Sequence, residues 1–207
     1  MKKLSNKKIT YLVKPLLFLS CLLPLALLVY DGFTDNLGVN PVETLTHGTG
    51  QWALRFLLIT LAITPLRRIS KVNWIIKLRR MLGLFAFFYA LLHFTTYIWL
   101  DQFFDWQEIL TDIPKRPFIT IGFIAFVLLI PLAVTSTNAM QRRLKKKWLI
   151  LHKLVYIIPM LVVVHFIWSL KADYSEPLVY TIVFLVLMLL RTVYDRKALI
   201  IKKASNN

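Results

Sequence analysis

The chain has 207 residues, of which 57% are hydrophobic, and its formal net charge is +16. A soluble domain of this length cannot bury so large an apolar fraction, so the composition predicts that lipid is the main solvent. The basic residues form short clusters between long apolar runs and do not follow one soluble face, which argues against a nucleic-acid partner. We therefore expect a membrane protein whose loops and tails are basic.

Six apolar runs have a length close to the 17 to 25 residues that cross a bilayer. They lie near residues 15–30, 52–66, 81–100, 118–135, 148–170 and 178–194. No small-residue cleavage site follows the first run, so we expect it to be retained and not removed as a signal peptide. The prediction is an all-α polytopic membrane helix bundle with six transmembrane helices at 15–194, between basic tails at 1–14 and 195–207. No internal repeat is expected.

Charge orients this bundle. Of the 26 Lys and Arg residues, 21 lie before residue 15, in the connections around 67–80 and 142–147, and from Arg191 onward. The other connections hold nine of the ten acidic residues. Because basic residues accumulate in cytoplasmic loops, both termini are predicted to be cytoplasmic, with the basic clusters facing anionic lipid.

Cysteine and glycine usage limits the cofactors. The single cysteine, Cys21, lies inside the first span, so a disulfide framework, a four-thiolate cluster and a covalent haem attachment are not expected. Gly48 and Gly50 do not form a dinucleotide-binding loop, so nicotinamide chemistry would belong to another protein.

Histidines are the polar residues of interest inside the spans. His93 lies in the third run, and His152 and His165 lie in the fifth. At a rise of about 1.5 Å per residue, His93 and His165 fall at one depth in the outer half, and His152 lies roughly 20 Å nearer the cytoplasm. Two imidazoles at one level suit the axial positions of a haem iron, whereas zinc would need further ligands. The alternative for each histidine is a hydrogen bond to a neighbouring carbonyl.

Small residues share the face of the third span that carries His93. Gly83, Ala86 and Ala90 fall with His93 and Tyr97 inside an arc of about 80° on a helical projection. This face would clear space for a porphyrin, and a helix-packing seam is the alternative.

His152 and His165 would lie roughly 140° apart on an ideal helix. Pro159 lies between them, and we expect a kink or a change of winding there to bring the two imidazoles toward a common partner.

The first outward loop contains NPVETLTH. Asn40 is a predicted N-cap, Pro41 suits a first turn, and Glu43 completes a capping-box pattern, so a short surface helix is expected to run to Gly48. His47 is a candidate contact for a haem edge, with a structural role as the alternative.

These segments resemble a known family. RRMLGLFAFFYALLHFTTY, WLILHKLVY and VVVHFIW are similar to the ferric-reductase-type transmembrane domain shared with NADPH oxidases. With GVNPVETLTHGTGQWAL and PKRPFITIGF, they resemble the haem-binding membrane subunits of the bacterial periplasmic protein-methionine-sulfoxide reductase system over nearly the whole chain.

The resemblance implies one or two b-type haems in the bacterial inner membrane. It also implies electrons from the quinone pool or a cytosolic flavin reductase, delivery to a periplasmic molybdopterin-containing catalytic subunit, and an association with FMN. Catalysis on the sulfoxide would belong to that partner.

This sequence differs from the NADPH oxidases at one position. The oxidases have two histidines on the third helix. Here Arg79 or Arg80 stands one level below His93, so His152 has no histidine partner. We expect His152 to bind a second haem as its single protein ligand, with Arg79 or Arg80 near a propionate; an ordinary interfacial histidine is the alternative.

The sequence is compatible with two functions for the intramembrane histidines. An electron conduit with haems at two depths is favoured. A small transporter using the intramembrane histidines and Lys153 is the alternative, but it would more naturally show inverted repeats and interrupted helices.

Overall fold

The computed structural model describes residues 6–204, with side chains described for 11–196. Within these ranges the chain contains helices and turns and no strand. The helices are α1 (Asn6–Phe33), α2 (Pro41–Ser70), α3 (Arg79–Thr96), α4 (Trp106–Lys115), α5 (Pro117–Val134), α6 (Asn138–Leu144), α7 (Lys146–Leu151), α8 (Ile157–Ser169) and α9 (Ser175–Ala204). Tighter or wider turns occupy Asn73–Leu78 and His152–Tyr156 (3₁₀) and Tyr97–Asp101 (π). The all-α prediction is confirmed.

Among the described residues, five helical stretches are long and apolar enough to cross a membrane. They are Tyr11–Phe33, Asn73–Asp101, Pro117–Val134, Lys146–Ser169 and Ser175–Arg196, and each contains one of the six apolar runs of the sequence or most of it. The remaining run, 52–66, lies inside the 30-residue α2. Large hydrophobic side chains stay exposed along these helices, as expected for surfaces that face lipid.

The N-terminus of α2 follows its capping signal. The Asn40 side chain accepts a hydrogen bond from the Glu43 backbone N–H at 3.3 Å and donates one to the Glu43 carboxylate at 2.9 Å, with Pro41 in the first turn. The predicted N-cap at Asn40 is confirmed, and Glu43 bonds back to the Asn40 side chain, whereas a strict capping box would use the Asn40 backbone N–H. The expected short surface helix ending at Gly48 is wrong, because α2 continues without a break to Ser70.

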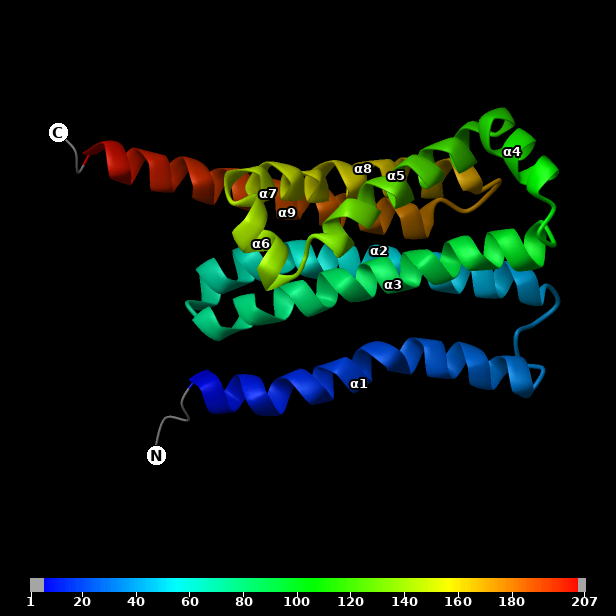
Figure 1. The fold of residues 1–207 in the computed structure, drawn as a ribbon, viewed down its shortest axis with the longest axis horizontal. Coiled ribbons are helices and arrows are strands. Elements are labelled where there is room, and N and C mark those ends of the chain that lie inside the picture. Colours follow the sequence, from blue (N-terminus) through cyan, green and yellow to red (C-terminus); the bar gives the residue numbers. More distant parts are fainter. Residues whose placement is uncertain (1–5, 205–207) are drawn as a thin grey trace.

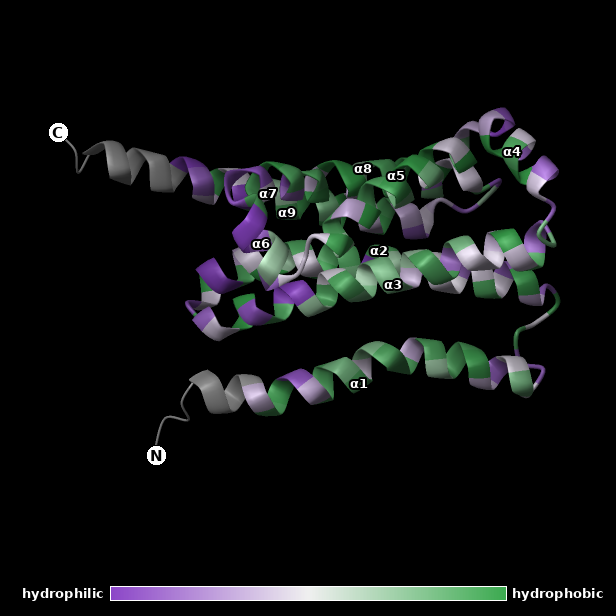
Figure 2. Cartoon of the chain, viewed as in Figure 1, coloured by the Kyte–Doolittle hydropathy of each residue, from purple (hydrophilic) through white to green (hydrophobic). Residues whose placement is uncertain are grey.

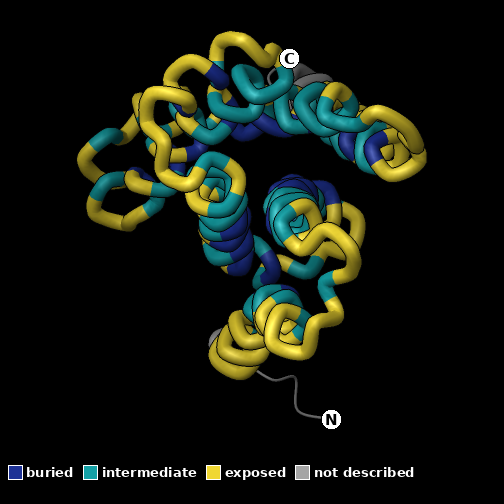
Figure 3. The backbone as a smooth tube through the Cα atoms, turned by 90° about the vertical axis from the view of Figure 1, so that its right-hand side faces the viewer, coloured by how far each residue is buried: buried dark blue, intermediate teal, exposed yellow. Residues whose placement is uncertain are grey.

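The helices form layers (Figure 1). The pair α2 and α3 occupies the middle, α1 lies on one side, and α5, α8 and α9 lie on the other, an arrangement that the end-on view repeats (Figure 3). Buried residues of α2, α3, α5 and α8 form most of the core, in which Leu54, Tyr89 and Ile158 are among the fully buried side chains.

Both described ends of the chain lie at one end of the bundle (Figure 1). The hydrophilic α2–α3 connection and the α6 region lie at that same end (Figure 2). There Arg68 of α2 pairs with Asp195 of α9 at 2.6 Å. Helix boundaries differ from the expected tails, because α1 begins at Asn6 within 1–14 and α9 extends to Ala204 within 195–207. Residues 1–5 and 205–207 of those tails lie outside the described part.

Candidate functional site

A cavity of about 300 Å³ lies between the two helix pairs α2–α3 and α5–α8. Its volume falls at the lower end of the range for small-molecule and cofactor sites, about 300–1,000 Å³. The lining is mainly apolar and includes Leu54, Phe94, Phe123, Phe126 and Phe166. The lining also includes polar residues. Among them are three of the four histidines of the chain, His47, His93 and His165.

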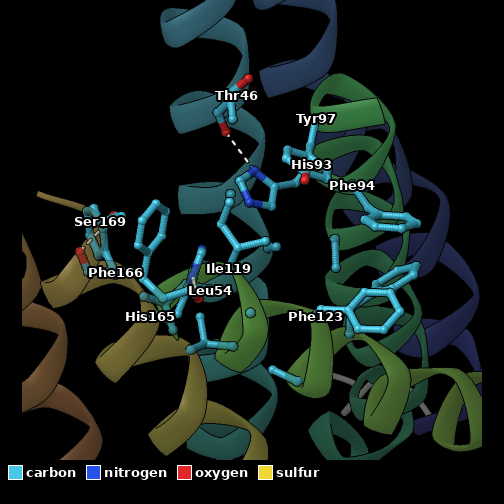
Figure 4. Close-up of a pocket in the computed structure, with 18 of the residues that line it drawn as sticks. Thr46, Leu54, His93, Phe94, Tyr97, Ile119, Phe123, His165, Phe166 and Ser169 are labelled. Carbon is cyan, nitrogen blue, oxygen red and sulfur yellow. Dashed lines mark hydrogen bonds between the residues drawn. The ribbon is translucent and has the colours of Figure 1, made fainter. Parts of the chain in front are cut away.

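His93 and His165 project into this cavity from α3 and α8 (Figure 4). The centroids of their rings lie 6.1 Å apart, with an angle of 73° between the ring planes. The rise-based prediction that these two residues share one level is therefore confirmed. Helices from different parts of the chain bring together two imidazoles inside an apolar pocket.

Each imidazole is held by a backbone carbonyl of the neighbouring helix. Nδ1 of His93 lies 2.9 Å from the carbonyl oxygen of Thr46 on α2, and Nδ1 of His165 lies 2.7 Å from that of Phe118 on α5. A carbonyl can only accept, so Nδ1 carries the proton in the neutral ring and donates it. The lone pair then resides on Nε2, for which no hydrogen bond occurs among the described residues.

This arrangement suits metal ligation. Histidines that bind a metal through one nitrogen commonly donate the other N–H to a carbonyl, which fixes the tautomer and the ring orientation. With metal–imidazole bonds of about 2 Å, an ion between two imidazoles holds their ligating nitrogens about 4 Å apart, and ring centroids at 6.1 Å leave room for that. The described residues contain no group of three or more His, Cys, Asp or Glu placed to hold an ion, so His47 does not complete a three-ligand site.

Two glycines allow the histidines to approach the neighbouring helices. A Cβ atom at Gly50 of α2 would lie 3.0 Å from His93 Nδ1, and one at Gly122 of α5 would lie 2.7 Å from His165 Nδ1. Both contacts are closer than real Cβ atoms comfortably make, and the Gly122 contact would force the imidazole to move. Sequence reasoning missed both glycines.

A polar cluster stands on the wall of the cavity near α4. Asp112 is buried, and its carboxylate accepts a hydrogen bond from the Tyr97 hydroxyl at 3.0 Å and pairs with Arg116 at 2.7 Å. Tyr97, Arg116 and Asp101 line the cavity beside it. This cluster joins α4 to the π-helical turn that follows α3, and sequence reasoning missed it too. The available signal was an acid four residues before Arg116 on a short amphipathic helix.

The small residues expected beside His93 divide between two environments. Ala90 lines the cavity. Gly83 instead faces α2, where a Cβ would lie 3.6 Å from the Thr60 side chain, and Ala86 is buried in the core with 1% of its surface exposed. The structure does not bring Gly83 or Ala86 to the cavity, and the packing-seam alternative describes them.

His152 lies away from the cavity. Its ring stacks on Trp148 with centroids 3.9 Å apart, and its Nδ1 lies 3.2 Å from the Trp148 carbonyl oxygen one turn earlier. The other three histidines all line the cavity, so none of them is its partner. Arg79 lies in its neighbourhood, whereas Arg80 donates to the Asn138 side chain at 2.8 Å.

The change of winding expected at Pro159 occurs one turn earlier. Residues His152–Tyr156 form a 3₁₀ turn, and Pro159 stands in the first turn of α8, where its missing N–H leaves no gap. His152 lies near the Leu132 carbonyl of α5, and His165 bonds to Phe118 of the same helix. The two imidazoles therefore have no common bonding partner, since His152 bonds to Trp148 and His165 to Phe118.

Comparison with known proteins bears on this site. Residues 49–175, more than half of the chain, match the family model described as ferric reductase like transmembrane component. A protein of Herminiimonas arsenicoxydans, "Protein-methionine-sulfoxide reductase heme-binding subunit MsrQ", is 53% identical over 95% of this chain and 89% of its own length.

The chain belongs to the MsrQ family. MsrQ proteins of Polaromonas naphthalenivorans and Caulobacter vibrioides are 48% and 47% identical over 94% and 95% of the chain, covering 90% and 94% of their own lengths. Membership of the MsrQ family, and of the wider ferric-reductase-like group, confirms the resemblance found in the sequence. The matched range contains Gly50, His93, Gly122, His152 and His165.

Proposed function

We propose that the chain is a membrane haem subunit that passes electrons to a methionine sulfoxide reductase. The observation that carries this proposal is the His93–His165 pair, with ring centroids 6.1 Å apart and each Nδ1 bonded to a carbonyl. The proposal is supported by the names of the MsrQ relatives, which contain the words "heme-binding subunit". Bound haem would supply one-electron redox chemistry.

The residues of this chain would hold the haem without covalent attachment. His93 and His165 would provide Nε2 as axial ligands, Ala90 would leave space beside His93, and the aromatic walls would exclude water. The carbonyls of Thr46 and Phe118 would keep each imidazole in the tautomer that ligates, and the hydrogen bonds raise ligand basicity. A dry pocket and two neutral ligands are among the means by which a protein sets a haem potential.

We propose that α2 provides the sixth span and that the end holding the basic clusters faces the cytoplasm of a bacterial inner membrane. Basic residues gather at that end, where α2 finishes with Arg67 and Arg68 and both described chain ends lie (Figure 2). The positive-inside rule then places the His93–His165 cavity in the outer half.

A second haem at His152 is proposed for the inner half. His152 would be its only protein ligand, and Arg79 or Arg80 would stand near a propionate. Arg79 lies close to His152, which supports the first of these two arginines more than the second. Haem quantified in purified His152→Ala tests this: loss of one haem of two is expected, and an unchanged count removes the inner site.

The donor and acceptor are proposed from the resemblance. Electrons would come from the quinone pool or a cytosolic flavin reductase, with FMN as an associated cofactor, and would leave for a periplasmic molybdopterin-containing reductase that performs the catalysis. Asn40, Glu43 and His47 belong to the outer half of α2 and its cap, and they are candidates for contact with that partner or with quinone. His47 lines the cavity, so it also is a candidate for contact with the haem edge.

An optical spectrum of the purified protein tests the proposed function. We expect a Soret band that shifts on reduction, and a haem that organic solvent extracts because no thioether bond holds it. A purified, folded protein that lacks this band after expression with adequate haem supply would contradict the function.

A further inference from the structure

We propose that the cavity is built from two equivalent half-sites, α2–α3 and α5–α8, and that Gly50 and Gly122 are the positioning residues that set the two histidines. This inference rests on the proposed haem function, and it concerns how the chain holds the imidazoles. The hydrogen bonds of the cavity follow a regular pattern.

The two histidine bonds have the same separation along the chain. His93 bonds to a carbonyl 47 residues earlier, and His165 also bonds to a carbonyl 47 residues earlier. In each case the glycine that faces the ring stands four residues after that carbonyl, Gly50 after Thr46 and Gly122 after Phe118. Both half-sites therefore consist of a carbonyl, a glycine one turn on, and a histidine from the next long helix.

The equivalence extends to the walls of the cavity. All of the lining residues except Asp101, Ile113 and Arg116 form pairs 72 positions apart, as His93 and His165 do. Five of these pairs hold the same residue type, among them Ala53 and Ala125, and Phe94 and Phe166. The expectation that the sequence contains no internal repeat is thus wrong at the residues that line the cavity.

The regular repeat of an α-helix explains only some of these pairs of lining residues. Once one residue of α2 matches one of α5, the other lining positions of those helices follow from the helical repeat. The match between α3 and α8 is separate, because it depends on the chain length between the helices. The connecting segments differ, because one contains a 3₁₀ turn at Asn73–Leu78 and the other contains α6, α7 and the 3₁₀ turn at His152–Tyr156. They nevertheless return the histidine to the same position relative to its glycine.

The glycines act on ring position through space alone. Neither glycine has a positive φ, so backbone conformation does not require glycine at either site. What requires it is the ring: a methyl group at Gly122 would approach His165 Nδ1 at 2.7 Å and Cε1 at 2.8 Å, and one at Gly50 would approach the same atoms of His93 at 3.0 and 3.1 Å. A Cβ would push each ring away from its carbonyl and turn Nε2 away from the shared centre.

The test uses alanine at each glycine of the full chain. Alanine is a better helix former than glycine, so Gly50→Ala and Gly122→Ala should keep the helices, which far-ultraviolet circular dichroism checks. Gly83→Ala is the matched control, because Gly83 is a helical glycine of α3 whose Cβ would have ordinary contact with Thr60 at 3.6 Å. The readouts are the low-spin electron paramagnetic resonance signal of the ferric haem, its reduction potential, and the rate at which haem transfers to apomyoglobin.

We expect both cavity variants to change the low-spin signal and potential and to lose haem faster, with Gly122→Ala the more affected and Gly83→Ala unchanged. Loss of a partner that orients a metal-bound histidine typically lowers metal affinity by about 10- to 100-fold, which sets the expected size of the effect. Signals identical to the parent protein in both variants, a change in only one of them, or an equal change in Gly83→Ala would overturn the two-half-site inference. Absence of haem from the parent protein would instead contradict the proposed function.

Discussion

The hydroxyl of Tyr89 on α3 forms hydrogen bonds with two backbone groups of α1, one at Leu25 and one at Cys21. It accepts the Leu25 backbone N–H at 3.1 Å and donates to the Cys21 carbonyl at 2.9 Å. Pro24 precedes Leu25 and has no N–H, so the hydrogen-bond ladder of α1 is already interrupted there. One fully buried phenol therefore links α1 to α3 next to this proline.

Tyr89→Phe should weaken this attachment. Two buried backbone groups would lose their partner, which costs about 1–3 kcal/mol in typical cases. We expect a lower thermal unfolding midpoint in detergent and faster proteolysis of the α1–α2 connection. Tyr11→Phe is the control, because Tyr11 is 86% exposed on the same helix; equal effects of the two substitutions would refute the role given to the phenol.

Asp112→Asn should loosen the cavity wall beside α4. The substitution removes the charge that holds Arg116 at 2.7 Å and weakens the acceptor for Tyr97, so α4 should separate more easily from the end of α3. Faster haem transfer to apomyoglobin is expected, by about 10-fold if the loss approaches 1.4 kcal/mol. Glu108→Gln, on the exposed face of α4, should leave the rate unchanged. A normal rate of haem transfer in Asp112→Asn would show that the attachment of α4 does not slow haem loss from the cavity.

The proposed orientation predicts which sites react with a membrane-impermeant thiol reagent. Cys21 is 2% exposed, so the parent chain should stay unlabelled. In intact cells with a permeable outer membrane, Val39→Cys should be labelled and Gln141→Cys should react only after the inner membrane is opened. Neither substitution changes the charge that orients the bundle. Labelling in the opposite order would place the basic end outside.

Much of this architecture could be predicted from the sequence, because hydropathy and the rise of a helix act locally. Apolar runs located the helices, and the positions of His93 and His165 within their runs placed them at one depth. The Asn40–Glu43 cap depends on four consecutive residues and was equally accessible. The length of α2 could not be predicted from the sequence, because nothing local distinguishes a surface helix ending at Gly48 from one that continues into the bilayer.

The residues that face the cavity and the glycines that contact the histidines are determined by packing between helices, which the sequence does not show directly. Gly83 and Ala90 lie within one arc of α3, but which part of that arc meets α2 and which meets the cavity depends on where the neighbouring helices stand. Gly50 and Gly122 carried a signal, since each precedes its histidine by 43 residues. That signal acquires meaning only when the structure shows that both rings press on those glycines.

The equivalence of the two helix pairs also predicts a gain of function at the inner level. Arg80 precedes His93 by 13 residues, as His152 precedes His165, so Arg80 is the equivalent of His152 in sequence. If His152 binds an inner haem alone, Arg80→His should provide a second imidazole and raise the number of low-spin, bis-imidazole haems per protein from one to two. An unchanged number, in a variant that keeps its outer haem, would argue against a haem at this level.

The most direct test of the haem account is the electron paramagnetic resonance spectrum of the ferric protein with His93 or His165 replaced singly by alanine. The account predicts that the parent protein gives a low-spin signal from bis-imidazole iron, that each single substitution abolishes this signal, and that His152→Ala retains it. Persistence of the signal in His93→Ala or in His165→Ala would contradict the claim that these two imidazoles ligate one iron.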